Sequence, residues 1–151
     1  MELRRWQQKI VDDFPTILAS YKRFILKAPT GAGKTVLARE IIDRFYENKK
    51  VLVLCHRLVL LDQLEGALSE GRRVRTLAVS DKGKAFTDYD ILLSTSMRAR
   101  EVVADAISKA DLIIVDEAHR VSPNGKGYKR IIDKFRDDSK EGAHFLGLTA
   151  S

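Results

Sequence analysis

Short, nearly continuous apolar runs recur along the chain. Six of them are candidate strands, at residues 24–26, 51–54, 74–79, 91–93, 112–115 and 145–148. A run without alternating polar positions indicates a strand that is buried on both faces, which is typical of a parallel sheet covered by helices. The pattern therefore predicts a mainly parallel central sheet between two helical layers.

Two segments between these runs carry a helical repeat. Apolar side chains recur every three to four positions over residues 37–45 and again over residues 58–68. Two polar segments, residues 80–90 and 120–127, are expected to be loops. Alternating strands and helices predict one three-layer α/β domain over residues 1–151, and ligands of such domains bind at the carboxyl ends of the strands.

Composition narrows the class of protein. The chain has 151 residues, is 44% hydrophobic and carries a formal charge of +6, so a mainly disordered chain is excluded. The single cysteine, Cys55, cannot form an internal disulfide and is expected to be a small core residue. No apolar run approaches the ~20 residues of a membrane-spanning helix. These features predict an intracellular protein, cytoplasmic or nucleoid-associated, without a membrane partner.

A glycine-containing loop follows the first apolar run and leads directly into the first helical repeat. It reads Ala28-Pro29-Thr30-Gly31-Ala32-Gly33-Lys34-Thr35. Strand, loop and helix are in the order of a phosphate-binding loop (P-loop), where backbone N–H groups converge on phosphate oxygens. Lys34 would reach the β and γ phosphates of ATP, and Thr35 would offer its hydroxyl to Mg²⁺. A tight glycine turn that binds no ligand is the alternative.

Two adjacent carboxylates, Asp116 and Glu117, follow the apolar run at residues 112–115. At a strand end beside a phosphate site, Asp116 can hold Mg²⁺ and Glu117 can polarise the water that attacks the γ-phosphate. We therefore predict Glu117, Lys34 and Asp116 as catalytic residues, and Thr35 and Asp116 as metal ligands. The alternative is a solvated strand end followed by a turn.

With these two motifs the sequence resembles superfamily 2 helicases and translocases, specifically the first RecA-like domain of DEAH-box-type proteins. Residues 28–35 match motif I of that family, and Asp116-Glu117-Ala118-His119 matches motif II. The resemblance covers essentially the whole chain and implies a RecA-like P-loop NTPase fold. It also implies a Mg²⁺-dependent ATP hydrolase that unwinds or moves along DNA. An RNA helicase and a nucleotide-binding scaffold without activity of its own are the alternatives, and a small-molecule kinase is disfavoured because motif II favours water as the acceptor.

The beginning of the chain resembles another family motif. Leu3-Arg4-Arg5-Trp6-Gln7 is similar to the Leu-Arg-Pro-Tyr-Gln opening of these domains. In the family the arginine and the glutamine contact adenine, so the resemblance implies that Arg4 and Gln7 bind the base together with the P-loop residues Pro29, Thr30, Gly31, Ala32, Gly33, Lys34 and Thr35. An ordinary amphipathic first helix is the alternative.

Shorter matches imply contacts with nucleic acid. His56 and Arg57 stand in a segment similar to motif Ia, and Thr95 stands where motif Ib is expected. Through the resemblance these residues would contact the DNA or RNA backbone. Surface polarity and a helix cap are the alternatives.

The last residues resemble motif III, which links hydrolysis to nucleic-acid binding in the family. By that match Thr149, Ser151 and His119 would couple the two sites. The family's later motifs, including an arginine that stabilises the transferred phosphate, lie on a second RecA-like domain. The resemblance therefore implies a chain truncated before that domain, with the second domain as a partner and with weak or absent hydrolysis on its own.

Overall fold

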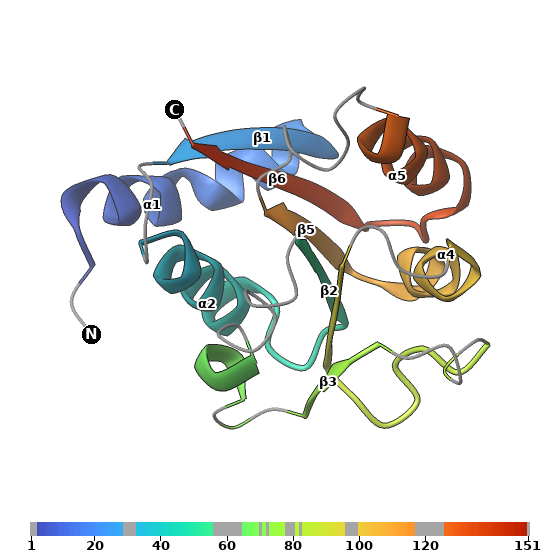
Figure 1. Ribbon diagram of the computed structural model, residues 1–151. Helices are drawn as coiled ribbons and strands as arrows, with labels where there is room; N and C mark the ends of the chain where they lie inside the picture. Colours follow the sequence, from blue (N-terminus) through green and yellow to red (C-terminus); the bar gives the residue numbers. More distant parts are fainter. Residues whose placement is uncertain are drawn as a thin grey trace.

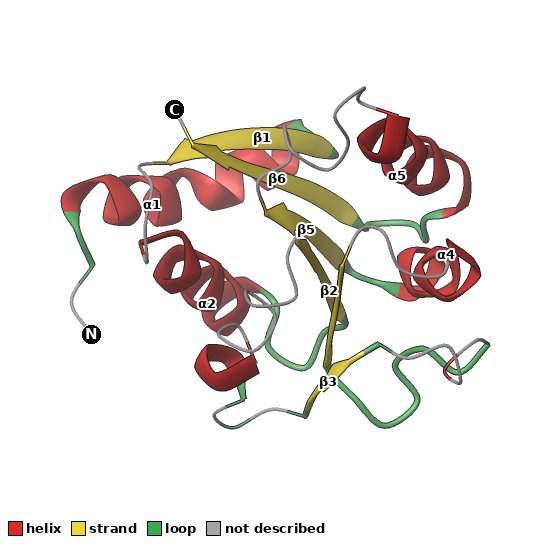
Figure 2. Cartoon of the chain, viewed as in Figure 1, coloured by secondary structure: helices red, strands yellow, loops and turns green. Residues whose placement is uncertain are grey.

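In the part of the chain that the structure describes, six parallel strands form one central sheet, and helices cover both of its faces (Figure 1). The computed structural model describes residues 3–28, 33–55, 65–69, 71, 73–77, 81, 83–95, 100–116 and 126–150. The elements in chain order are α1 (Arg5–Ser20), β1 (Arg23–Ala28), α2 (Gly33–Phe45), β2 (Val51–Cys55), β3 (Val74–Thr76), β4 (Ile91–Thr95), α4 (Arg100–Lys109), β5 (Leu112–Asp116), α5 (Lys126–Asp138) and β6 (His144–Ala150). Figure 2 shows the same elements by type. The predicted three-layer α/β fold is confirmed.

The strands lie side by side in the order β1-β6-β5-β2-β4-β3, and every pairing between them is parallel. The strand latest in sequence, β6, lies between β1 and β5, so that Leu146 is opposite both Phe24 and Ile114. The third predicted run is shorter than expected, because the strand there ends at Thr76. Of the predicted helix at residues 58–68, residues 65–68 are helical and residues 58–64 lie outside the described residues.

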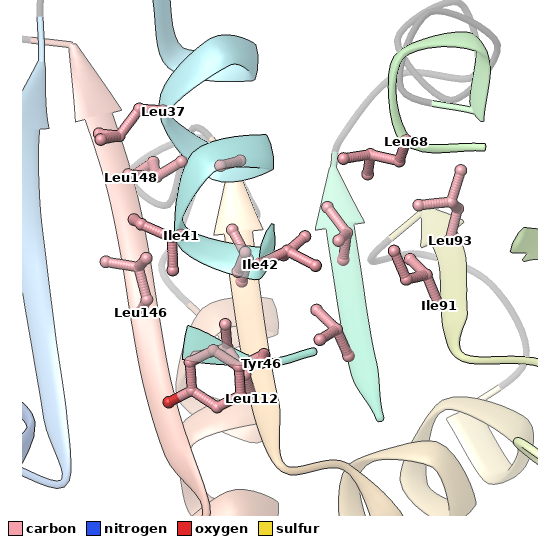
Figure 3. Packing of buried hydrophobic residues seen from close by; sticks show 14 of the residues in the cluster. Leu37, Ile41, Ile42, Tyr46, Leu68, Ile91, Leu93, Leu112, Leu146 and Leu148 are labelled. Carbon is pink, nitrogen blue, oxygen red and sulfur yellow. The ribbon is translucent and has the colours of Figure 1, made fainter. Parts of the chain in front are cut away.

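Alternate residues of the central strands face opposite helical layers. In β2, Val51 and Val53 pack into a core with α1 and α2, whereas Leu52 and Leu54 pack into a second core with α4 and α5. Both sets are fully buried, which explains why the sequence shows continuous apolar runs. In the first core, shown in Figure 3, α2 lies over strands β5 and β6, and its side chains pack with those of the sheet. The residues labelled there are Leu37, Ile41, Ile42, Tyr46, Leu68, Ile91, Leu93, Leu112, Leu146 and Leu148.

Three phenylalanine rings join α1 to the rest of this core. The Phe14 ring of α1 lies 5.7 Å from that of Phe24 in β1 and 5.0 Å from that of Phe45 in α2, measured between centroids. Such aromatic pairs contribute about 0.5–1.5 kcal/mol each beyond the burial of their surface. Phe14 is fully buried, so α1 is a packed part of the domain.

The predicted polar loop at residues 80–90 contains one residue that the sequence did not single out. Phe86 is only 5% exposed and packs into the second core with Leu92 and Val103. Its φ of 67° is in the left-handed region, which costs a residue with a side chain about 1–2 kcal/mol. Burial of a phenylalanine contributes about 1.5–3 kcal/mol and offsets that cost.

Two expectations from composition concern the core and the membrane. Cys55 is fully buried at the end of β2, which confirms it as a core residue. No helix in the described part of the chain combines the length and the apolar character that crossing a bilayer requires.

Asp111, which directly precedes β5, interacts with two other segments at the amino-terminal edge of the sheet. One carboxylate oxygen accepts a hydrogen bond from the backbone N–H of Lys50, at 2.8 Å, and the other pairs with Nζ of Lys140, at 2.7 Å. Burial alone would raise the pKa of Asp111. The hydrogen bonds from Lys140 and Lys50, with the charges of Lys140 and Lys49, outweigh this effect and hold the pKa below its ordinary value.

We expect Asp111→Asn to lower the free energy of unfolding by about 1 kcal/mol near neutral pH, because it weakens a partly exposed ion pair and a charge-assisted hydrogen bond. A carboxylate with a lowered folded-state pKa stabilises the fold above the unfolded-state pKa, and this stabilisation is lost as pH falls through the folded-state value. Urea titrations should therefore show a difference between variant and wild type that shrinks well below pH 3.8, the ordinary aspartate pKa. Asp13→Asn, at an exposed position of α1, is the control. A difference that does not change with pH would contradict this role of Asp111.

Candidate active site

The predicted site residues that the structure describes gather at the carboxyl edge of the sheet. Because the strands are parallel, all of them end at this edge, at Ala28, Cys55, Thr76, Thr95, Asp116 and Ala150. Helix α2 also begins here, at Gly33, after the end of β1. Ligands of open α/β sheets bind at this edge, so the predicted catalytic residues lie where the fold can use them.

An ion pair joins the two motifs that the sequence singled out. Nζ of Lys34, in the first turn of α2, lies 3.3 Å from Oδ1 of Asp116, the last residue of β5. The two side chains are only 9% and 18% exposed. A pair shielded from water in this way interacts more strongly than a pair on the open surface.

Asp116 also offers an oxygen atom that could hold a metal ion. Its Oδ1 atom is buried and makes no hydrogen bond within the described residues, although the Lys34 ammonium is close. Thr35 lines the same small recess as Lys34 and Asp116. A carboxylate and a hydroxyl are the oxygen ligands that Mg²⁺ prefers, so the residues present fit this ion.

The ligand set near Asp116 is sparse. Within the described ranges, no group of three or more His, Cys, Asp or Glu side chains is placed to hold a metal ion. Mg²⁺ is commonly bound through one or two carboxylates together with substrate phosphates and water, and it does not need a cage built by the protein alone. The arrangement therefore suits a metal ion that arrives with a phosphate ligand.

The start of α2 provides a second element suited to an anion. The helix has 13 residues, and its first two, Gly33 and Lys34, are buried at the carboxyl edge. The N–H groups in the first turn of a helix have no partners within the helix, and the helix dipole places partial positive charge at this end. The other predicted loop residues, Pro29, Thr30, Gly31 and Ala32, lie outside the described residues, so their role stays a prediction.

The residues expected to contact adenine lie against the start of α2. Nε2 of Gln7 donates a hydrogen bond to the carbonyl oxygen of Gly33 at 2.8 Å, and its Oε1 accepts one from the backbone N–H of Arg4 at 2.8 Å. Gln7 is 2% exposed. A glutamine three residues after a helix N-cap is the sequence signal for the contact with Arg4. The contact with Gly33 joins helices α1 and α2, which are separate in sequence, and the sequence analysis did not predict it.

Thr149 and Thr95 lie at different distances from the Lys34–Asp116 pair. Thr149 of β6 directly follows Leu148, the residue opposite Asp116 in the neighbouring strand. Thr95 ends β4, which is separated from β5 by β2 and therefore lies roughly 10 Å away across the sheet. The remaining predicted residues, Glu117, His56, Arg57, His119 and Ser151, lie outside the described residues.

Several known proteins are similar to this chain in sequence or in fold. The family model "Type III restriction enzyme, res subunit" (ResIII) matches residues 1–151. QP509L of African swine fever virus, named as a candidate ATP-dependent RNA helicase, is 28% identical over 124 residues, which cover 79% of this chain and 24% of the viral protein. The chain spans 9–24% of the length of the first curated relatives that it matches.

Two solved structures extend the comparison. The Hef helicase domain of Pyrococcus furiosus is 25% identical, with a TM-score of 0.74 over 98% of this chain and 32% of that chain. The SWI2/SNF2 ATPase core of Sulfolobus solfataricus, solved in complex with dsDNA, is 21% identical, with a TM-score of 0.70 over 99% of this chain and 32% of that chain. The similarity to the SWI2/SNF2 core shows a shared fold alone. With the family match over its whole length, the chain belongs to the ResIII family and is a first RecA-like domain of the superfamily 2 helicases and translocases.

Proposed function

We propose that this domain binds Mg·ATP at the carboxyl edge of its sheet and hydrolyses it as one half of the active site of a nucleic-acid-dependent motor. The observation that supports this most directly is the approach of Lys34 Nζ to Asp116 Oδ1, at 3.3 Å. It brings a cation suited to phosphate and a carboxylate suited to a metal ion together at the start of a helix.

Each residue has a distinct role in this proposal. The N–H groups of the predicted P-loop and Lys34 bind the β and γ phosphates, while Thr35 and Asp116 hold Mg²⁺ through their oxygen atoms. When bound, Mg²⁺ neutralises charge that develops on the phosphate oxygens. Glu117, the next residue after β5, accepts a hydrogen bond from the attacking water and orients it. Arg4 and Gln7 contact adenine from the start of α1.

The nucleic acid and a second domain complete the proposed motor. His56, Arg57 and Thr95 contact the nucleic-acid backbone, and His119, Thr149 and Ser151 couple that contact to hydrolysis. We propose DNA as the substrate, in line with the similar SWI2/SNF2 core that was solved in complex with dsDNA. RNA is the alternative, in line with the similar viral protein that is named as a candidate RNA helicase. A second RecA-like domain supplies the arginine that stabilises the transferred phosphate.

We expect the chain alone to bind ATP in the presence of Mg²⁺, to bind it more weakly when EDTA removes the metal, and to hydrolyse it slowly. An arginine acting on the transferred phosphate is worth about 10³-fold or more in rate, and in this proposal it comes from another domain. Calorimetry measures binding, and steady-state ATPase assays with and without single-stranded DNA measure turnover.

Two results would contradict parts of this proposal. Turnover of several ATP per second that rises on addition of DNA would mean that the chain carries a complete active site. Binding without hydrolysis, even after a second RecA-like domain is added, would favour a nucleotide-binding scaffold.

A further inference from the structure

Three side chains from the start of α1 crowd the backbone of Gly33, the first residue of α2. A Cβ atom built on Gly33 would lie 2.9 Å from Cζ2 of Trp6, 3.3 Å from Nη1 of Arg4 and 3.4 Å from Nε2 of Gln7. An approach under 3.0 Å to the ring of a packed side chain leaves no room for a methyl group. Glycine is therefore required at position 33 because the Trp6 indole occupies the space beside it.

Trp6 and Gln7 hold Gly33 in different ways. The amide of Gln7 donates a hydrogen bond to the Gly33 carbonyl oxygen. The indole of Trp6 occupies the space in which a Cβ atom of residue 33 would lie, and it packs on the core formed by α1, α2 and the sheet. A hydrogen bond fixes the direction of the carbonyl, whereas a large planar ring prevents the backbone from moving toward α1.

The helix that carries these side chains is itself well anchored. Val11 and Phe14 of α1 are buried, and the Phe14 ring packs on the rings of Phe24 and Phe45. Because α1 is anchored in this way, Trp6 cannot easily move away from the backbone of Gly33. A support of this kind holds atoms in place within the few tenths of an ångström that a binding site needs.

We propose that Trp6 is a positioning residue for phosphate binding, because its indole holds the Gly33 backbone and with it the first N–H groups of α2. This inference rests on the proposed function, in which these N–H groups and Lys34 bind the phosphates of ATP. Trp6 acts through Gly33 and needs no contact with the base or the ribose.

The test compares three variants with one control. Trp6→Ala removes the ring, Trp6→Leu keeps apolar volume without a planar ring, and Trp6→Phe keeps a smaller ring. Ile10→Ala is the control, since Ile10 lies one turn further along α1 on the same core and is not among the side chains nearest to Gly33. Thermal unfolding shows which variants are folded, and Trp6→Leu decides the question if Trp6→Ala is not.

Two probes separate support of the backbone from contact with the base. Calorimetry measures the affinity of each variant for Mg·ATP and for inorganic tripolyphosphate, which has no base or ribose. We expect Trp6→Ala and Trp6→Leu to bind both probes about tenfold more weakly or worse, because backbone displacements of 1 Å can cost up to about 10²-fold. Trp6→Phe lacks the ring atom nearest to residue 33 and should lie between these variants and wild type, whereas Ile10→Ala should stay within about threefold of wild type.

Each other outcome overturns the inference in a recognisable way. Wild-type affinity in both Trp6→Ala and Trp6→Leu would show that the ring does not support the site, while the proposed function stands. A loss for ATP without a loss for tripolyphosphate would assign Trp6 to the base. No binding of ATP by the wild-type chain would overturn the proposed function together with this inference.

A spectroscopic readout is built into the chain. Trp6 is its only tryptophan, so the intrinsic indole fluorescence comes from the position beside Gly33. We expect the emission of the wild-type protein to change on titration with tripolyphosphate, with a midpoint equal to the calorimetric dissociation constant. An emission that stays constant while calorimetry shows binding would contradict the contact between ring and site.

Discussion

Lys34→Ala is expected to weaken binding of Mg·ATP by about 10- to 100-fold or more. The lysine would make charge-assisted hydrogen bonds to phosphate, each worth about 1.5–3 kcal/mol, and every 1.4 kcal/mol is a factor of ten in affinity. The fold should persist, because the apolar face of α2 is formed by Leu37, Ile41 and Ile42, which the change leaves intact. Titration with a fluorescent ATP analogue measures the affinity, and circular dichroism measures the fold.

Lys134→Ala is the matched control for this experiment. Lys134 also pairs with an aspartate, Asp138, but on α5, away from the carboxyl edge of the sheet. Its replacement removes a paired lysine without touching the proposed site, so nucleotide affinity should be unchanged. Equal affinity in Lys34→Ala and wild type would refute the assignment of the phosphate site to the start of α2.

Glu117→Gln is expected to reduce the rate of ATP hydrolysis by about 10²-fold or more while leaving nucleotide affinity nearly unchanged. Glutamine preserves the shape of the side chain but cannot accept a proton, and a positioned general base contributes about 10²–10⁴-fold. Because turnover of this chain should be slow, the measurement is a single-turnover assay with radiolabelled ATP and long incubation.

The control for this second change is Glu47→Gln. Glu47 is exposed and follows α2 at the opposite edge of the sheet from Asp116, so its replacement removes the same charge far from the proposed chemistry. Loss of hydrolysis in Glu117→Gln with full activity in Glu47→Gln is the expected result. Undiminished hydrolysis in Glu117→Gln would mean that another residue orients the water.

The layers of the fold could be predicted because burial leaves a direct mark on the sequence. The run at residues 112–115 is apolar at every position, since its alternate side chains face two different cores. The same logic placed Lys34 and Asp116 at one edge, because Asp116 ends a strand of the parallel sheet and Lys34 lies in the first turn of the helix that follows another strand. Their separation of 3.3 Å depends on side-chain packing and could not be obtained from the spacing of motifs.

Other features left no periodic signal. Phe86 and its neighbour Ala85 stand in a segment that is otherwise mostly polar, so their burial in the second core could not be distinguished from an exposed loop position. The contacts of Trp6 and Gln7 with Gly33 connect residues that are far apart in sequence, and a single sequence contains no information on such pairs. The order of the strands in the sheet could not be predicted for the same reason, because neighbouring strands are far apart in sequence.

The position of β6 has a consequence for the order in which the protein assembles during its synthesis. β1 lies next to β6 in the sheet, so that Arg23 is opposite Phe145, although most of the sequence separates these two residues. On the ribosome, the residues of β1 and the start of α2 emerge early, but the strand that joins β1 to β5 emerges after every other described element. Contacts between segments so distant in sequence form slowly. β1, which leads into the helix that carries Lys34, therefore joins the sheet only after β6 has formed, so we expect a nascent chain to become able to bind ATP late in its folding.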